Sequence, residues 1–200
     1  MKRRLILASA SPRRIEMFRK NGIEAEICPS NLQERLPEGI SPEQTVLYLS
    51  LGKALDVERR FLEKNPLPEE RVFILGADTV VFTNRILGKP KDEEEAFEML
   101  KSLCGGEHRV LTGVSIVEAG TVNRKSFFES TKVRTKSYSD EDIRRYIATG
   151  EPMDKAGAYA IQGGFSAYID GFDGDYDNVI GLPWKMVREE LEKMGFILQN

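Results

Sequence analysis

The order of hydrophobic and polar positions along the chain predicts alternating strands and helices. Short continuous apolar runs are typical of strands that are covered on both faces. They occur at residues 5–7, 72–75 and 80–82, and residues 25–28 predict a further short strand. Apolar residues spaced three or four apart predict helices with one buried face. That spacing occurs at residues 46–57, 97–103 and 184–194. The paired runs at 110–117 and 122–135 predict a long hairpin, so we expect an α/β fold with a mixed sheet in a single domain over residues 1–200.

Residues at the expected helix boundaries support these assignments. A small polar residue followed by proline, or by an acid or amide three positions later, is typical of a helix start. Such signals occur at Ser11–Pro12, Ser41–Pro42–Gln44, Asp92–Glu95 and Ser139. We also expect a short strand at residues 86–90 that carries Lys89, and a loop rich in Gly and Asp at residues 174–183.

The stretch LILASASPRR at residues 5–14 joins an expected strand to an expected helix. Arg13 and Arg14 fall in the first helical turn, where the helix dipole already places positive charge. A bound anion would resolve that conflict, because Ser9 and the free N–H groups of the helix start also favour a phosphate. The alternative is that both arginines are solvated surface charges.

Asp78 lies within an aliphatic run, between 72–75 and 80–82. An isolated buried carboxylate is costly, so this side chain is paired, bound to a metal, or shifted in pKa. A structural ion pair is the competing explanation for its position.

Three further charged residues are candidates for binding a phosphate or a metal ion. Glu34 lies in an expected loop, Lys53 in the long helix, and Lys89 after the third aliphatic run. Cations together with acids suggest a phosphate ester with a divalent ion, since Mg²⁺ takes carboxylate and substrate oxygens. The ordinary alternative for Lys53 is a lysine that extends along the helix surface into solvent. The chain has neither GxxxxGK[ST] nor GxGxxG, which excludes a Walker site and a dinucleotide fold.

Composition excludes several other classes. The 29 basic and 32 acidic residues give a net charge of -3, which argues against nucleic-acid binding. No apolar stretch approaches the roughly 20 residues of a membrane helix, so we expect a soluble cytoplasmic protein without membrane contact. The two cysteines lack CxxC spacing, and the single histidine, His108, is expected to be a packing or hydrogen-bonding residue rather than a ligand or base.

Six motifs occur in order along nearly the whole chain. They are LASASPRR at 7–14, GADTVV at 76–81, LGKP at 87–90, HRVLTGV at 108–114, EPMDKAGAYAIQG at 151–163 and NVIGLP at 178–183. Together they resemble the motifs of the Maf, or septum-formation, family of nucleoside triphosphate pyrophosphatases. The resemblance implies a fold similar to that of inosine triphosphate pyrophosphatases, with an elongated sheet, and a homodimer. It also implies metal-dependent hydrolysis, with Mg²⁺ or Mn²⁺, of a nucleoside triphosphate to the monophosphate and diphosphate.

The resemblance also assigns roles to residues. It makes Asp78 the proton acceptor, and Arg13, Thr79 and Gln162 match the residues that distinguish the branch acting on dTTP and UTP, with modified pyrimidine nucleotides as further substrates. The family commonly has an Asp-Glu pair where this chain has Gln33 and Glu34. The family name also suggests an alternative function, a regulator of cell division that binds a partner protein and uses the nucleotide as a signal.

The expected mechanism is attack by water on the α-phosphorus. Positioning and charge neutralisation dominate phosphoryl transfer. Ser9 and Arg14 would hold phosphate oxygens, and Lys53 and Lys89 would neutralise the leaving diphosphate. Asp78, with Glu34, would hold the metal or activate the water, and the sequence leaves both roles open.

Overall fold

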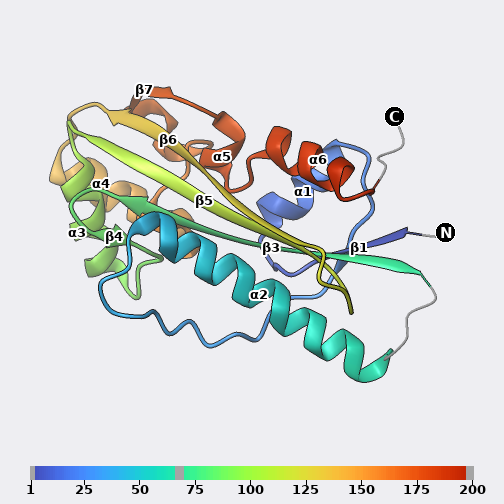
Figure 1. Cartoon of the computed structure of the whole chain (residues 1–200). Helices are drawn as coiled ribbons and strands as arrows, with labels where there is room; N and C mark the ends of the chain where they lie inside the picture. Colours follow the sequence, from blue (N-terminus) through green and yellow to red (C-terminus); the bar gives the residue numbers. More distant parts are fainter. Residues whose placement is uncertain (1–2, 66–69, 197–200) are drawn as a thin grey trace. The chain divides into compact units, whose positions relative to one another are not determined.

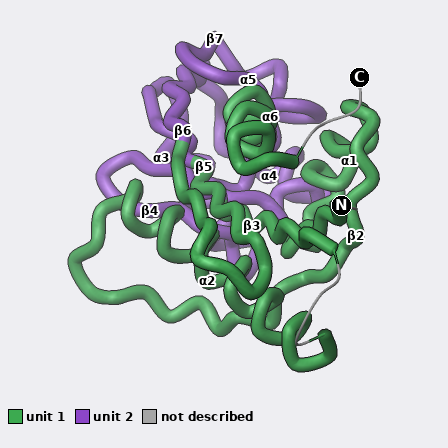
Figure 2. The backbone as a smooth tube through the Cα atoms, turned by 45° about the vertical axis from the view of Figure 1, so that its right-hand side comes forward, with its two compact units in different colours: residues 1–78, 112–128, 181–200 green, residues 79–111, 129–180 purple. Residues whose placement is uncertain are grey.

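The computed structural model describes residues 3–65 and 70–196. Contacts within the chain divide it into two compact units, shown in different colours in Figure 2. Unit 1 comprises Met1–Asp78, Thr112–Phe128 and Gly181–Asn200, and unit 2 comprises Thr79–Leu111 and Glu129–Ile180. The expected single domain over residues 1–200 stays a prediction.

Unit 1 contains the amino-terminal elements and the last helix. Its strands and helices are β1 (Arg3–Leu7), α1 (Pro12–Lys20), β2 (Glu26–Ile27), α2 (Pro42–Lys64) and α6 (Trp184–Lys193). Three long strands have residues in both units: β3 (Arg71–Phe82), β5 (Glu107–Glu118) and β6 (Arg124–Thr135). Figure 1 shows α2 running alongside β3 and β5.

Unit 2 contains shorter elements. They are β4 (Ile86–Leu87), α3 (Glu93–Leu103), α4 (Asp140–Ile147), β7 (Ile169–Asp173), α5 (Tyr176–Ile180) and three 3₁₀ turns at Glu151–Asp154, Ala156–Ala158 and Gly164–Tyr168. Phe165 is the centre of an aromatic cluster in this unit, with ring centroids 5.1 to 5.5 Å from those of Tyr138, Tyr146, Tyr159 and Tyr168.

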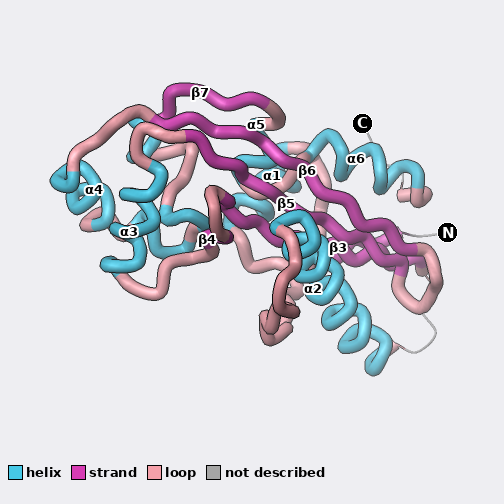
Figure 3. The backbone as a smooth tube through the Cα atoms, turned by 60° about the vertical axis from the view of Figure 1, so that its left-hand side comes forward, coloured by secondary structure: helices cyan, strands magenta, loops and turns pink. Residues whose placement is uncertain are grey.

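The seven strands form one mixed sheet in the order β2-β1-β3-β5-β6-β7, with β4 also paired to β3. Strand β1 is parallel to both of its neighbours, whereas β4 and β7 pair antiparallel with β3 and β6. Figure 3 shows the strands in magenta and the helices in cyan. The predicted α/β class with a mixed sheet is confirmed. Among the described residues, no helix is long and apolar enough to cross a membrane.

Helix α2 packs unusually close to β3. A Cβ atom on Gly76 would lie 2.2 Å from the carbonyl oxygen of Ser50, so only glycine allows this approach. The Ser50 hydroxyl also contacts that of Ser115 on β5, at 3.0 Å. Lys53 follows Ser50 by three residues and therefore shares its face of the helix. The close packing thus brings Lys53 toward β3 two residues beyond Gly76.

Most expected helix starts are confirmed. Ser41 and Ser139 both form capping boxes, and the Asp92 side chain accepts a hydrogen bond from the Glu95 N–H. Helix α1 does begin at Pro12, but the Ser11 side chain makes no capping hydrogen bond. Instead, the Ser11 N–H donates to the Ser9 hydroxyl at 3.2 Å.

Two other expectations are wrong. The strand predicted at residues 86–90 ends at Leu87, so Lys89 lies in a loop. Pro90 has no N–H, and the Gly88 carbonyl accepts from the Gly157 N–H at 2.9 Å, so neither of these groups extends the ladder. The predicted loop at 174–183 contains helix α5, whose start is stabilised by hydrogen bonds from the backbone of Asp177 and Asn178 to the Asp175 carboxylate.

Candidate active site

Asp78 lies in the middle of β3 and is only 8% exposed. Alternate side chains of a strand share one face, so Asp78 lies on the face of Gly76, which packs against α2. Its Oδ1 atom accepts a hydrogen bond from Nζ of Lys53 at 2.5 Å. The embedded carboxylate predicted from the sequence is therefore confirmed, and it is paired.

Lys53 joins two carboxylates. Besides Asp78, its Nζ atom contacts Oε1 of Glu34 at 2.8 Å. The Lys53 side chain is 17% exposed, so the solvent-extended alternative for this lysine is wrong. The loop acid, the helix lysine and the strand acid form one cluster, although the two acids are 44 positions apart in sequence. We refer to Glu34, Lys53 and Asp78 as the acid–lysine cluster.

Burial raises the pKa of Asp78 above its ordinary value, and the nearby Glu34 charge raises it further. Lys53 and Arg14 oppose this shift because their positive charges favour the ionised carboxylate. A carboxyl group with a raised pKa is a better proton acceptor than an ordinary surface aspartate. The same pair of acids also offers the oxygen ligands that a hard divalent ion prefers.

Arg14 is buried beneath the loop that follows β1. Its Nε atom donates to the Gly181 carbonyl at 2.8 Å, and Nη1 donates to the Ala77 carbonyl at 2.9 Å and the Ser9 hydroxyl at 3.2 Å. Burial lowers its pKa to about 10, with the Asp78 charge acting in the opposite direction. Arg14 therefore stays cationic at neutral pH, and the solvated-surface alternative is wrong for this residue.

Arg13, its neighbour, is arranged differently. It is half-buried and makes no hydrogen bond or ion pair to the residues that the structure describes. The first N–H groups of a helix have no acceptor within that helix, and α1 begins one residue before Arg13. The predicted anion site thus has an available guanidinium and a helix start beside it.

The remaining predicted residues belong to unit 2. Thr79 follows Asp78 directly on β3 and is half-buried, while Lys89 and Gln162 are exposed in loops. Side chains alternate along a strand, so Thr79 points to the opposite face from Asp78. The grouping of Thr79, Lys89 and Gln162 with the acid–lysine cluster stays a prediction.

The described residues contain no group of three or more His, Cys, Asp or Glu side chains that would by itself hold a metal ion. Glu34 and Asp78 nevertheless converge on a single cationic atom, Nζ of Lys53. Two carboxylates are the usual protein contribution to a Mg²⁺ site in which substrate phosphates and water supply the other ligands. The oxygen atoms of Glu34 and Asp78 therefore suit a divalent ion, although Nζ of Lys53 lies between the two carboxylates in this structure.

His108, which the sequence marked as a packing or hydrogen-bonding residue, has that role. It lies within β5, it is 2% exposed, and its Nε2 atom lies 2.7 Å from the Tyr159 hydroxyl. Burial lowers the pKa of His108 to about 4, so the ring is neutral at physiological pH.

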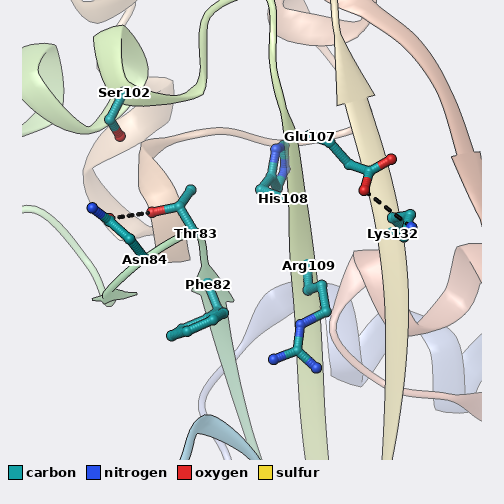
Figure 4. A pocket seen from close by; sticks show the side chains of 8 residues that line it. All are labelled: Phe82, Thr83, Asn84, Ser102, Glu107, His108, Arg109 and Lys132. Atoms are coloured by element: carbon teal, nitrogen blue, oxygen red, sulfur yellow. Dashed lines mark hydrogen bonds and ion pairs between the residues drawn. The ribbon is translucent and has the colours of Figure 1, made fainter.

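A cavity of about 550 Å³ in unit 2 holds none of the predicted site residues (Figure 4). Two of its lining residues form a cation–π contact, with the Arg109 guanidinium 5.1 Å from the centroid of the Phe82 ring. It also includes the ion pair of Lys132 with Glu107 at 3.0 Å. The other lining residues are Thr83, Asn84, Ser102 and His108.

Sequence reasoning missed the carbonyl partners of Arg14. The acceptors are backbone carbonyl groups of Ala77 and Gly181, and every residue has such a group, so the residue type does not reveal them. The motif NVIGLP contains Gly181, but its spacing alone assigns it no role.

The fold and the site together define a class: an α/β protein in which an acid–lysine cluster with a buried aspartate, and a helix start, suit phosphate chemistry. Comparison with known families is more specific, because the family described as Maf-like protein matches residues 4–194. The chain belongs to the Maf family, which confirms the resemblance seen in the motifs.

Individual relatives cover almost the entire chain. It is 45% identical to the dTTP/UTP pyrophosphatase of Caldicellulosiruptor bescii, over 99% of this chain and 98% of that protein. It is 46% identical to the protein of the same name from Agathobacter rectalis, over 96% of this chain and 97% of that protein. A solved structure, the Ham1 protein of Staphylococcus aureus, matches with a TM-score of 0.36 and 15% identity, over 67% of this chain and 72% of that one.

Proposed function

We propose that this protein is a nucleoside triphosphate pyrophosphatase that hydrolyses dTTP and UTP to the monophosphate and diphosphate. The observation that carries the proposal is the acid–lysine cluster, found in a chain of the Maf family. The names of relatives that are 45% and 46% identical over nearly the full chain support the same activity.

Asp78 is the proposed acceptor of the proton from the attacking water. Its raised pKa brings the carboxyl group closer to the working pH, which favours general base catalysis. Attack on the α-phosphorus makes diphosphate the leaving group. Lys53 and Lys89 would neutralise its developing charge, while Ser9 and the start of α1 would hold phosphate oxygens. Arg14 was expected to join them, but its N–H groups already donate to Ser9, Ala77 and Gly181, so we assign this contact to Arg13 instead.

Glu34 and Asp78 are the residues that would hold a divalent metal, Mg²⁺ or Mn²⁺. When bound, such an ion neutralises phosphate charge and lowers the pKa of a coordinated water. That second effect would relax the demand on Asp78 as a base. We therefore propose two roles for the Asp78 carboxylate, general base and metal ligand.

The proposed choice of base rests on hydrogen-bond patterns. Uracil and thymine present an acceptor at O4 and a donor at N3, whereas cytosine reverses the two. A site built for one pattern leaves polar groups unpaired against the other, which gives strong rejection. Gln162 offers both a donor and an acceptor, and Arg13 offers donors only. Together with Thr79, these residues are the proposed determinants of preference for dTTP and UTP.

The products of UTP hydrolysis test the activity. With Mg²⁺ or Mn²⁺ present, the purified protein should release UMP and diphosphate in equal amounts, and Asp78→Asn should abolish most of that release. Appearance of UDP and phosphate would place the attack on the γ-phosphorus and overturn the proposal. The absence of turnover with any triphosphate would instead favour the alternative of a division regulator. The homodimer and the cytoplasmic location stay predictions.

A further inference from the structure

We propose that Arg14 is a positioning residue that holds the Asp78 segment of β3 in place through backbone contacts, and that Arg13 alone of the two arginines contacts the substrate. This inference rests on the proposed function. It assigns a positioning role to Arg14 and a substrate-binding role to the adjacent Arg13. It also gives a role to the NVIGLP motif, through Gly181.

The contacts of Arg14 point into the protein. Its side chain joins three segments of unit 1: the loop after β1 at Ser9, strand β3 at Ala77, and the segment before α6 at Gly181. A guanidinium has five N–H donors in a fixed plane, and three N–H bonds are already made to these acceptors. Arg14 is 9% exposed, so most of its surface is removed from solvent and from any ligand. We refer to these three hydrogen bonds as the Arg14 junction.

The bond to Ala77 acts directly on Asp78. The Ala77 carbonyl and the Asp78 nitrogen belong to one planar peptide unit. Donation from Nη1 at 2.9 Å therefore fixes the orientation of that plane, and with it the point from which the Asp78 side chain extends toward Lys53. A carboxylate that must meet both a lysine and a reacting phosphate depends on such restraint, since misplacement by about 1 Å can cost roughly 10²-fold in rate.

The bond to Gly181 anchors the other end of the junction. Gly181 has φ 123°, a backbone conformation that favours glycine, and this conformation presents its carbonyl to Nε of Arg14. Trp184, three residues later, packs edge-on against Phe18 with ring centroids 5.2 Å apart. Arg14 and Phe18 are one turn apart on α1, so the same face of that helix makes both contacts. The start of α6 is thus attached to α1 at two points.

Lysine cannot replace this arrangement. Its ammonium is a point charge, whereas Arg14 uses the planar fork to reach acceptors in three directions. Arg13 has no such partners among the residues that the structure describes, so its guanidinium is available to a phosphate or a base. The two arginines are therefore distinguishable by how each variant changes kcat and KM.

The first experiment compares Arg14→Lys with Arg13→Lys, and uses Arg19→Lys on the exposed side of α1 as the control. For UTP hydrolysis, Arg14→Lys should lower kcat by about 10-fold or more while KM changes less than about threefold, because positioning acts on the reacting groups. Arg13→Lys should mainly raise KM, and Arg19→Lys should match the wild type. If Arg14→Lys raises KM by a larger factor than it lowers kcat, or behaves as wild type, the positioning role is wrong.

The second experiment needs no substrate, so it separates failure of this inference from failure of the proposed activity. Gly181→Ala strains the Gly181 end of the Arg14 junction. It therefore tests the same junction if Arg14→Lys does not fold. Both variants should change the fluorescence of Trp184, the only tryptophan, and speed amide exchange at Asp78. In the double variant Arg14→Lys/Gly181→Ala, amide exchange at Asp78 should be little faster than in either single variant, because both substitutions break the same junction. Unchanged fluorescence and amide exchange in both single variants, or a fully additive increase in the Asp78 exchange rate in the double variant, would overturn the proposal.

Discussion

Three predicted site residues of unit 1 and two of unit 2 are held in opposite ways. In unit 1, Asp78, Lys53 and Arg14 are shielded from solvent and bonded to one another or to the backbone. In unit 2, Lys89 and Gln162 are exposed on loops. Groups that take part in the chemistry gain from fixed positions, because no reorganisation is then required during the reaction. Exposed side chains on loops lose freedom only when a ligand orders them, which suits recognition rather than bond breaking.

The contrast yields a rule for variants. Changes in the bonded residues of unit 1 should lower the rate for every substrate by a similar factor. A change in Gln162, the exposed residue of unit 2 that is proposed to read the base, should alter the preference among substrates. The predictions below test this rule, or the packing that underlies it, in order of decreasing effect.

The largest effect is expected for Asp78→Asn. The amide keeps the shape but loses the proton acceptor and most of the charge that attracts a metal ion, so turnover should fall by at least about 10²-fold. The loss should be the same for UTP and dTTP, because the change does not touch the residues proposed to read the base. A loss confined to one of these substrates would contradict the assignment.

The pH dependence of the stability of Asp78→Asn is also predictable. The folded-state pKa of Asp78 is raised, so the folded protein keeps this proton to higher pH than the unfolded chain does. The stability that this proton provides is present at low pH and is lost as pH rises through the folded-state pKa. The melting temperature of Asp78→Asn, relative to wild type, should therefore be more favourable at pH 7 than at pH 4. A large fall at pH 7 with activity retained would mark Asp78 as a structural ion-pair partner.

Gly76→Ala tests the packing that brings Lys53 to Asp78. The added methyl group would meet the Ser50 carbonyl at 2.2 Å and the Ala54 nitrogen at 2.8 Å, which are backbone atoms of α2. Displacing that helix should cost about 2 kcal/mol of unfolding free energy and should also lower kcat. Gly88→Ala is the matched control, since nothing lies within 4 Å of its added atom. Urea unfolding of both variants measures the difference, and equal stabilities would contradict the close packing.

His108→Gln tests a buried residue of unit 2. Burial lowers the folded-state pKa of His108 to about 4, so between pH 6.5 and 4 the unfolded chain binds a proton that the folded protein does not. The wild type should lose about 1–2 kcal/mol of stability between pH 7 and 5 from this group alone. Glutamine can still bond to Tyr159 but does not titrate, so its pH dependence over that range should be flatter. Parallel curves for the two proteins would contradict the assigned shift.

Gln162→Glu should have the smallest effect. The carboxylate keeps the acceptors but loses the donors, so the ratio of kcat/KM for UTP to that for CTP should change by about 10-fold while hydrolysis continues. Changing Arg13 to an aromatic residue should move the same ratio. If the wild type uses UTP, dTTP, CTP and GTP within a few fold, or if the variants lose all four equally, these residues do not determine specificity.

Much of the fold was predictable because its signals are local. The capping boxes at Ser41 and Ser139 and the aliphatic runs of β1 and β3 depend on nearby residues. Asp78 was identifiable as a site residue because a carboxylate within an apolar strand is costly wherever the strand lies. Helix α5 was missed because the side chain that stabilises its start, Asp175, belongs to a segment that otherwise has the composition of a loop.

The rest of the site depends on contacts between distant segments. The pairing of Lys53 with both Glu34 and Asp78 is set by the approach of α2 to Gly76, and periodicity does not determine that distance. The junction of Arg14 with Gly181 spans 167 positions and uses a backbone acceptor, which any residue would supply. Sequence patterns predicted the residues of the candidate site, but not which of them contact one another.

Hydrolysis of UTP in ¹⁸O-labelled water tests the central claim most directly. If water attacks the α-phosphorus, the oxygen that it contributes must appear in UMP. Mass spectrometry after partial hydrolysis should therefore find one labelled oxygen in each UMP molecule and none in diphosphate. Label in diphosphate with unlabelled UMP would mean attack on the β-phosphorus, and would contradict both the proposed reaction and the role given to Asp78.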